Sequence, residues 1–196
     1  VVQKKTYSYE LDEKNNSLVR YSNNWFDLSS IAKGYAVQKI HDYLTSNNLN
    51  NHLIDIGGEL VISGTKKGEP WNIGIQNPLA TIESSTITIS NKNHDFLSIA
   101  TSGEYRNYKF DDKGNKVTHT INPKTLSSIT NNILSVTIVN ETSATYADAY
   151  ATAFNAMGVK KAIDVANSNN IASMIIFKNE DNVDIIYSDK WYDLFL

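Results

Sequence analysis

The chain of 196 residues contains no cysteine and only three prolines. The lack of cysteine excludes disulfide bonds, thiolate catalysis and zinc–thiolate sites, and it leaves the redox compartment open. No apolar run approaches the roughly 18 residues that cross a membrane, so the sequence predicts no membrane span. It also shows no secretory signal peptide, although any targeting segment would lie upstream of Val1.

A strong excess of one charge is also missing. The net charge is −3, and acidic and basic residues are interspersed along the chain. A general nucleic-acid-binding protein needs a basic face, so we expect no nucleic-acid partner. Hydrophobic residues make up 41% of the chain, which is enough for a substantial core. The length suits one domain or a compact pair of lobes, and no linker divides residues 1–196.

The hydrophobic pattern mixes strands and helices without a regular strand–helix–strand repeat. This mixture predicts an α+β fold with a largely antiparallel mixed sheet flanked by helices. Helices are expected at 31–44, 145–157 and 159–166, with Gly158 as a left-handed cap. Strands are expected at 6–11, 18–21, 53–56, 59–63, 71–75, 85–89, 97–101, 105–110, 117–121, 133–139, 171–177 and 183–187.

The helix predicted at 145–157 carries a carboxylate and a hydroxyl four residues apart. Asp148 and Thr152 therefore share one helix face. Such an oxygen pair suits a hard cation such as Mg²⁺. The alternative is structural: Asp148 favours the helix dipole, and the Thr152 hydroxyl bonds back to a carbonyl of the preceding turn.

Two glycine-containing junctions are candidates for phosphate binding. Residues 27–35 join a strand to a helix through two serines and Gly34, and the free N–H groups of such a junction attract anions. Ordinary helix capping by the serines is the alternative. Gly57 and Gly58 interrupt an apolar strand pattern, which indicates either a close approach by another group or a bend needed for packing.

A third polar segment, 98–108, combines hydroxyls, a glycine and Arg106. The guanidinium suits bidentate phosphate binding, or it is a surface charge on a strand. A turn at 113–115 predicts a hairpin that pairs Phe110 with Val117 and brings Tyr108 near His119. The other histidines are expected to be structural or exposed; they are His41, His52 and His94.

The joint order of these motifs resembles that of the ApbE-type FAD:protein FMN transferases, in their C-terminal two-thirds. The resemblance implies the family's T-fold-like α+β architecture. The matching segments cover most of the chain from Asp27 to Gly158. They are DLSSIAKGYA (27–36), IGGE (56–59), WNIGIQNP (71–78), TSGEYRNY (101–108), HTINPKT (119–125) and ADAYAT (147–152).

The resemblance implies a reaction that moves FMN from FAD to a threonine or serine of an acceptor protein and releases AMP. Mg²⁺ would be held by Asp148, Thr152 and the backbone carbonyl of Ala32, and His119 and Asp148 would be the catalytic residues. The remaining implied residues contact FAD; they are Ser29, Lys33, Tyr35, Gly57, Gly58, Glu59, Thr101, Ser102, Gly103, Arg106 and Ile121.

The chain departs from the family pattern at two positions and in length. Asn122 replaces an aspartate, which removes a negative charge near the phosphates, and Leu126 replaces a glycine. Family members continue well upstream of Asp27, so the chain is expected to be a fragment, a natural short form or half of a split protein. The resemblance also predicts an extracytoplasmic lipoprotein in the full-length form. Two alternatives stay open: an Mg²⁺-dependent FAD pyrophosphatase, and a non-catalytic flavin-binding domain.

Overall fold

The structure is a computed structural model. It describes residues 9–21, 26–76, 78, 86–103, 108–110, 116–118, 120–122, 127–129, 131–180 and 182–195. Every statement below concerns these residues. Among them, no helix is long and apolar enough to cross a membrane.

A six-stranded sheet forms the centre of the molecule, in the order β16-β15-β14-β9-β4-β3. All five neighbouring pairs are antiparallel, and β-branched residues fill the central strands because they pack well on a pleated surface. The predicted α+β class with an antiparallel sheet is therefore confirmed. The strands are β3 (His52–Ile56), β4 (Glu59–Ser63), β9 (Phe96–Gly103), β14 (Ile133–Asn140), β15 (Ala172–Asn179) and β16 (Asn182–Tyr187).

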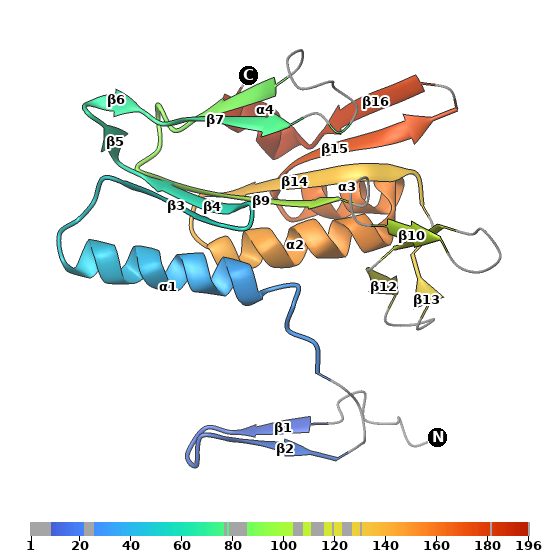
Figure 1. Ribbon diagram of the computed structural model, residues 1–196, viewed down its shortest axis with the longest axis horizontal. Coiled ribbons are helices and arrows are strands. Elements are labelled where there is room, and N and C mark those ends of the chain that lie inside the picture. The colour runs from blue at the N-terminus through green and yellow to red at the C-terminus, as the bar shows by residue number, and fades with distance from the viewer. Residues whose placement is uncertain are drawn as a thin grey trace.

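Three helices cover one face of this sheet (Figure 1): α1 (Ala32–Ser46), α2 (Ala144–Met157) and α3 (Val159–Ser168). Helix α2 lies against β9 and β14. Its buried Ala147 and Ala151 have small side chains that permit a close approach, and Phe154 fills the space further along the helix. The three expected helices are confirmed to within a few residues.

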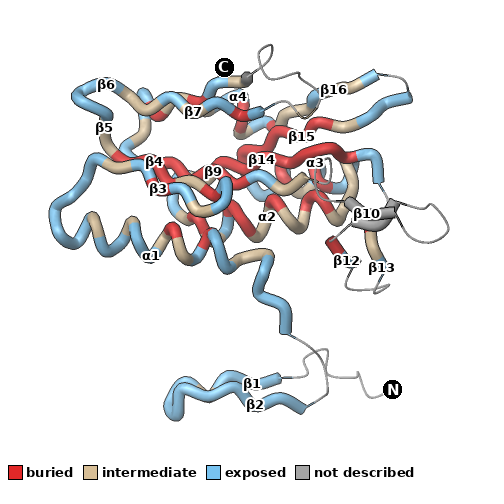
Figure 2. Tube along the Cα trace, viewed as in Figure 1, coloured by how far each residue is buried: buried red, intermediate tan, exposed pale blue. Residues whose placement is uncertain are grey.

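The opposite face is covered by the hairpin β7 (Asn72–Gln76)–β8 (Thr86–Ser90) and by α4 (Asp189–Phe195). Ile75, Ile89 and Trp191 are buried in the same cluster as residues of β9, β14 and β15. Helix α4 was not expected from the sequence, because its seven residues are too few for a helical period to stand out. The fold thus has three layers, with buried residues concentrated in the sheet (Figure 2).

Short hairpins complete the described structure. They are β1 (Tyr9–Asp12) with β2 (Ser17–Arg20), β5 (Thr65–Lys66) with β6 (Glu69–Pro70), β10 (Tyr108–Phe110) with β11 (Lys116–Thr118), and β12 (Ile121–Asn122) with β13 (Ser127–Ser128). The β1–β2 hairpin stands apart from the three layers, and nearly all of its residues are exposed (Figures 1 and 2).

Two local expectations were wrong. In the β10–β11 hairpin Phe110 pairs with Lys116 and Tyr108 with Thr118, one residue away from the predicted register. Register depends on the geometry of the turn, which the residue types alone left open. Gly158 has a positive φ of 80° but an extended ψ of 160°, so it is a glycine-dependent corner between α2 and α3 and not a left-handed cap.

His41 and His52 form a hydrogen-bonded pair that joins α1 to β3, which confirms a structural role for both. The His41 Nδ1 and His52 Nε2 atoms lie 2.9 Å apart, and His52 Nδ1 lies 2.7 Å from the Leu49 carbonyl oxygen. Because a carbonyl only accepts, His52 donates from Nδ1 and accepts from His41 at Nε2. Burial, together with the neighbouring His52, lowers the pKa of His41 below its usual value.

We therefore expect the free energy of unfolding to fall as the pH is lowered from 7 toward 5. The unfolded chain binds a proton at the ordinary histidine pKa, near ~6.5, whereas His41 in the folded protein resists protonation. The contribution of neutral His41 to the free energy of unfolding is fully present above the pKa of the unfolded chain. It is lost as the pH falls through the lower pKa of the folded protein. Urea denaturation at several pH values tests this, and His41→Gln should flatten the decline. An equal decline in both proteins would contradict it.

Candidate functional site

The first turn of helix α2 is held by contacts from the residues that directly precede the helix and from α1. The Ser143 hydroxyl accepts the Tyr146 N–H at 3.3 Å, and Asn140 Oδ1 accepts the Ser143 N–H at 2.8 Å. The side-chain carbonyl of Gln38 on α1 accepts the Ala144 N–H at 2.8 Å. These acceptors satisfy N–H groups that a helix start leaves unpaired, so α1 and α2 are held together where the site begins.

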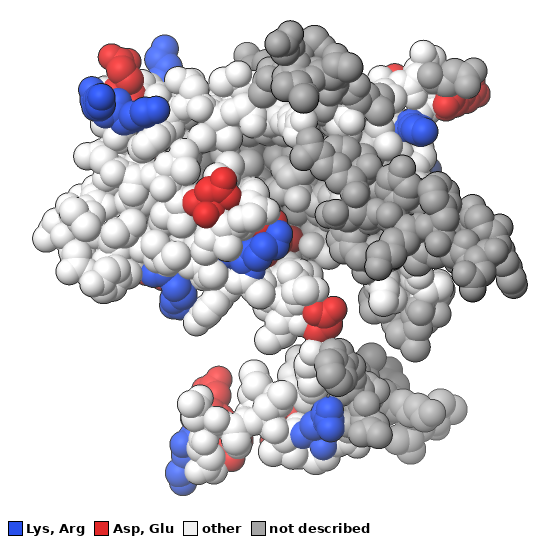
Figure 3. All heavy atoms as spheres, in the orientation of Figure 1, with Lys and Arg blue, Asp and Glu red and all other residues white. Residues whose placement is uncertain are grey.

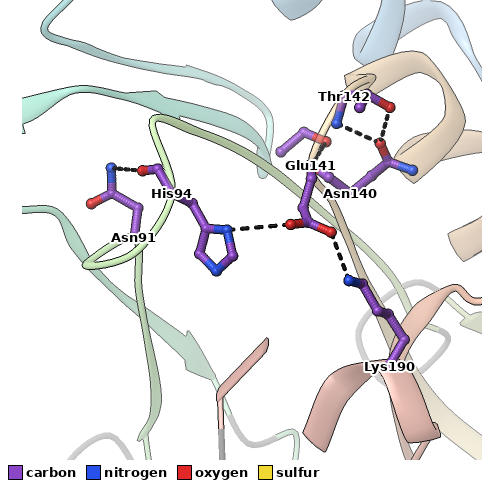
Figure 4. Close-up of polar contacts among 7 residues, drawn as sticks. Asn91, His94, Asn140, Glu141, Thr142 and Lys190 are labelled. Carbon is purple, nitrogen blue, oxygen red and sulfur yellow. Dashed lines mark hydrogen bonds and ion pairs between the residues drawn. The ribbon is translucent and has the colours of Figure 1, made fainter. Parts of the chain in front are cut away.

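A second anchor lies just before α2, at Glu141 (Figure 4). His94 Nδ1 lies 3.3 Å from Glu141 Oε1, and Lys190 Nζ lies 2.9 Å from Oε2. Glu141 therefore links the turn before β9 and helix α4 to the start of α2. These contacts restrict the segment that leads into α2.

Asp148 faces the first turn of α1. Its Oδ2 accepts the backbone N–H of Gly34 at 2.8 Å in a buried contact, and 4% of Asp148 is exposed. Only glycine fits at position 34, because a Cβ there would meet the Ala144 carbonyl oxygen and lie 2.6 Å from the Asp148 Cβ. The predicted meeting of the helix carboxylate with the 29–34 turn is therefore present.

The turn between β3 and β4 brings a second carboxylate to the same place. Glu59, which is 4% exposed, forms an ion pair with Lys33 Nζ at 2.5 Å. The Gly57 backbone has φ +63°, and a Cβ there would lie 3.6 Å from Lys33 Cδ, so the lysine side chain runs along the turn. Gly58 has φ +99°, and its N–H is accepted by Asp55 Oδ1 at 2.9 Å.

Burial dominates the electrostatics of both carboxylates. Desolvation raises the pKa of Asp148, and the Gly34 N–H and the Lys33 charge oppose this rise. Desolvation also raises the pKa of Glu59; Lys33 opposes the rise and the negative charge of Asp148 adds to it. Two carboxylates and one ammonium thus interact in a poorly solvated place. A further positive charge there would stabilise the ionised form of the carboxylates.

Polar side chains continue along α2 beyond Asp148. Thr152 is half-buried one turn later, and Asn155 is fully buried seven residues after Asp148, so all three lie along one face. Asn155 Nδ2 contacts Ser102 Oγ on β9 at 3.4 Å, and the hydroxyls of Thr101 and Thr137 lie 2.9 Å apart across β9 and β14. Asn155 and Gln38 were not predicted; the seven-residue spacing was a signal for Asn155.

The structure brings together only part of the predicted set. Lys33, Glu59 and Asp148 converge with Gly57, Ala32 opens the same turn of α1, and Thr101, Ser102 and Gly103 end the strand that packs on α2. Ser29, Tyr35 and Ile121 are exposed, and no described contact joins them to Asp148. His119 and Arg106 lie outside the described residues.

The donor atoms at Asp148 fit Mg²⁺ better than a metal that requires many protein ligands. Within the described part of the chain, no cluster of three or more His, Asp or Glu side chains is placed to hold a metal. Mg²⁺ typically keeps several waters and takes one or two carboxylates together with substrate phosphates. The single buried carboxylate of Asp148 is compatible with that requirement.

One surface feature lies away from this cluster. A pocket of about 170 Å³ is lined by Asn140, Glu141, Thr142 and Lys190 among others, and its lining includes neither Asp148 nor Lys33. On the face shown in Figure 3, acidic and basic side chains are interspersed over the described surface.

Comparison with solved structures identifies the class of protein that this fold and site define. The chain superposes on the flavinyl transferase ApbE of Pseudomonas stutzeri in its apo form with a TM-score of 0.82 and 28% identity, over 96% of this chain and 56% of that one. The flavin transferase ApbE of Vibrio cholerae gives 0.80 and 31%, over 96% and 58%. The architecture is that of flavin transferases.

The sequence comparisons agree. The ApbE family model matches residues 3–176. The chain is 37% identical to the FAD:protein FMN transferase of Vibrio cholerae over 80% of its own length and 46% of the relative's. The corresponding protein of Haemophilus influenzae is 36% identical over 80% and 44%. The chain belongs to the ApbE family, which confirms the resemblance, and it spans about half the length of these curated relatives.

Proposed function

We propose that the chain carries the metal and phosphate side of an FAD:protein FMN transferase site. The observation that supports this most directly is the contact of Asp148 with the Gly34 N–H, beside the Lys33–Glu59 ion pair. Three motifs far apart in the sequence meet there, and they supply a carboxylate suited to a cation, an ammonium suited to a phosphate, and the buried acid that pairs with this ammonium. The matched relatives are named as FAD:protein FMN transferases.

In the proposed reaction, a hydroxyl oxygen of an acceptor threonine or serine bonds to the FMN phosphorus of FAD. The phosphorus–oxygen bond to the AMP phosphate breaks, AMP leaves, and the hydroxyl proton is released. The pyrophosphate carries negative charge that repels the nucleophile, so catalysis depends on positive charge and N–H groups at the phosphates.

Asp148, Thr152 and the Ala32 carbonyl would hold Mg²⁺, and Lys33 would bind a phosphate oxygen of FAD. When bound, the metal neutralises pyrophosphate charge and stabilises the leaving AMP. The first turn of α1 contributes the positive end of its dipole. Thr101, Ser102 and Gly103 would complete the nucleotide site, and His119 would assist proton transfer or hold a phosphate.

The test is to incubate the chain with FAD, Mg²⁺ and an acceptor flavoprotein domain, and to follow AMP release and the acceptor mass. We expect AMP together with an acceptor heavier by one FMN less one water, and neither when the acceptor hydroxyl is removed by Thr→Ala. AMP and free FMN with an unchanged acceptor mass would identify a pyrophosphatase instead. Bound FAD without AMP would identify a non-catalytic flavin-binding domain.

A further inference from the structure

The Lys33 ammonium is paired with one of the two carboxylates of the cluster and acts on the other only through its charge. Its partner is Glu59, at 2.5 Å, and the other carboxylate is that of Asp148. Lys33 directly precedes Gly34, whose N–H is already bonded to Asp148 Oδ2 at 2.8 Å. The root of the lysine side chain therefore starts next to the Asp148 carboxylate, and its tip is directed to Glu59.

This arrangement implies a competition. An ammonium and a divalent cation both bind carboxylate oxygens, so a Lys33 side chain paired with Asp148 would oppose a metal there. The lysine has a flexible four-carbon stem, and its side chain is 45% exposed, so the stem has room to change direction. Glu59 is the partner that the structure gives it instead.

We propose that Glu59 is a positioning residue that holds the Lys33 ammonium away from Asp148 and so leaves Asp148 available to a divalent cation. The inference rests on the proposed cation site at Asp148. Glu59 suits this role because it is buried and its place is set by the Gly57–Gly58 turn, whose positive φ values favour glycine. A carboxylate at the surface would be mobile and would hold the ammonium less firmly.

Long-range attraction is the alternative explanation, because any negative charge near Asp148 favours cation binding. The two explanations differ in their dependence on Lys33. If Glu59 acts through the lysine, its removal matters only while the lysine is present. If it acts through its own charge, its removal matters equally with and without the lysine.

The experiment measures Mn²⁺ affinity without FAD, from the electron paramagnetic resonance signal of free Mn²⁺. The proteins are the parent chain, Glu59→Gln, Lys33→Met and the double variant. We expect Glu59→Gln to weaken Mn²⁺ binding about tenfold with Lys33 present and less than about twofold in the Lys33→Met background, as for two coupled residues. Lys33→Met alone should strengthen binding.

Glu59→Asp provides a second test, with a side chain that keeps the charge and loses reach. We expect it to weaken Mn²⁺ binding as Glu59→Gln does, because the shorter acid no longer holds Lys33. Urea denaturation confirms that each variant is folded. Unchanged binding in Glu59→Asp, or an equal effect of Glu59→Gln in both backgrounds, would overturn the proposal. Asp148→Asn with unchanged Mn²⁺ affinity would instead remove the cation site and the proposed function with it.

Discussion

Asp148→Asn is expected to abolish Mg²⁺-dependent release of AMP from FAD, with a fall in kcat/KM of about 1,000-fold or more, equivalent to about 4 kcal/mol of transition-state stabilisation. The amide removes the charge that would hold the metal. It keeps an oxygen that accepts the Gly34 N–H, so the contact between α1 and α2 survives. Because burial raises the pKa of Asp148, the neutral side chain should not reduce the free energy of unfolding.

The matched control is Asp42→Asn on α1. Asp42 is an exposed acid that lies 3.7 Å from Lys39 Nζ and accepts a hydrogen bond from Gln38 at 2.9 Å, and an asparagine keeps an oxygen that can accept this hydrogen bond. Its variant should release AMP at the parent rate. Turnover by Asp148→Asn at the parent rate in the same assay would show that the metal is not held by this carboxylate.

Gly34→Ala should lower the free energy of unfolding by about 2 kcal/mol, although the same change in an exposed helix interior stabilises by up to about 1 kcal/mol. The added Cβ would meet the Ala144 carbonyl oxygen and the Asp148 Cβ, and both belong to packed α2. The helices must separate to admit it, so the Gly34–Asp148 hydrogen bond and AMP release should be lost together. Urea denaturation and the AMP assay measure the two effects.

The control is Thr45→Ala, at an exposed position of the same helix. It changes the helix propensity of α1 without changing its packing against α2. It should leave stability equal to the parent or slightly higher. A Gly34→Ala protein as stable as this control would mean that α1 does not lie against α2 as described.

Part of the site could be predicted from the sequence, because local periodicity determines it. The four-residue spacing of Asp148 and Thr152 requires only that residues 145–157 be helical, and α2 is helical there. Gly57 and Gly58 indicated either a close approach by another group or a bend, and the structure has the bend: both have positive φ, and a Cβ at Gly57 would make only ordinary contact with Lys33, at 3.6 Å. The family resemblance gave Lys33 and Glu59 as separate ligand contacts. It could not show that they pair with each other, because no local rule relates residues 26 positions apart.

Gln38 and Asn155 show what local patterns miss. Each is an ordinary amide on a helix until another element comes near it: Gln38 accepts the first N–H of α2, and Asn155 contacts Ser102 on β9. Their roles depend on the distance between helices. That distance is set by the small residues Gly34, Ala147 and Ala151, and by the cores on both faces of the sheet.

Sequence patterns alone were thus sufficient for the class of the fold, its main helices and strands, and the motifs of its family, because hydrophobic period and glycine placement act over short ranges. Tertiary packing alone decided that the start of α1, the β3–β4 turn and Asp148 lie together, and that the Lys33 ammonium pairs with the buried Glu59. Contacts between residues more than 100 positions apart, such as Gly34 and Asp148, arise only when the sheet and its helices are packed.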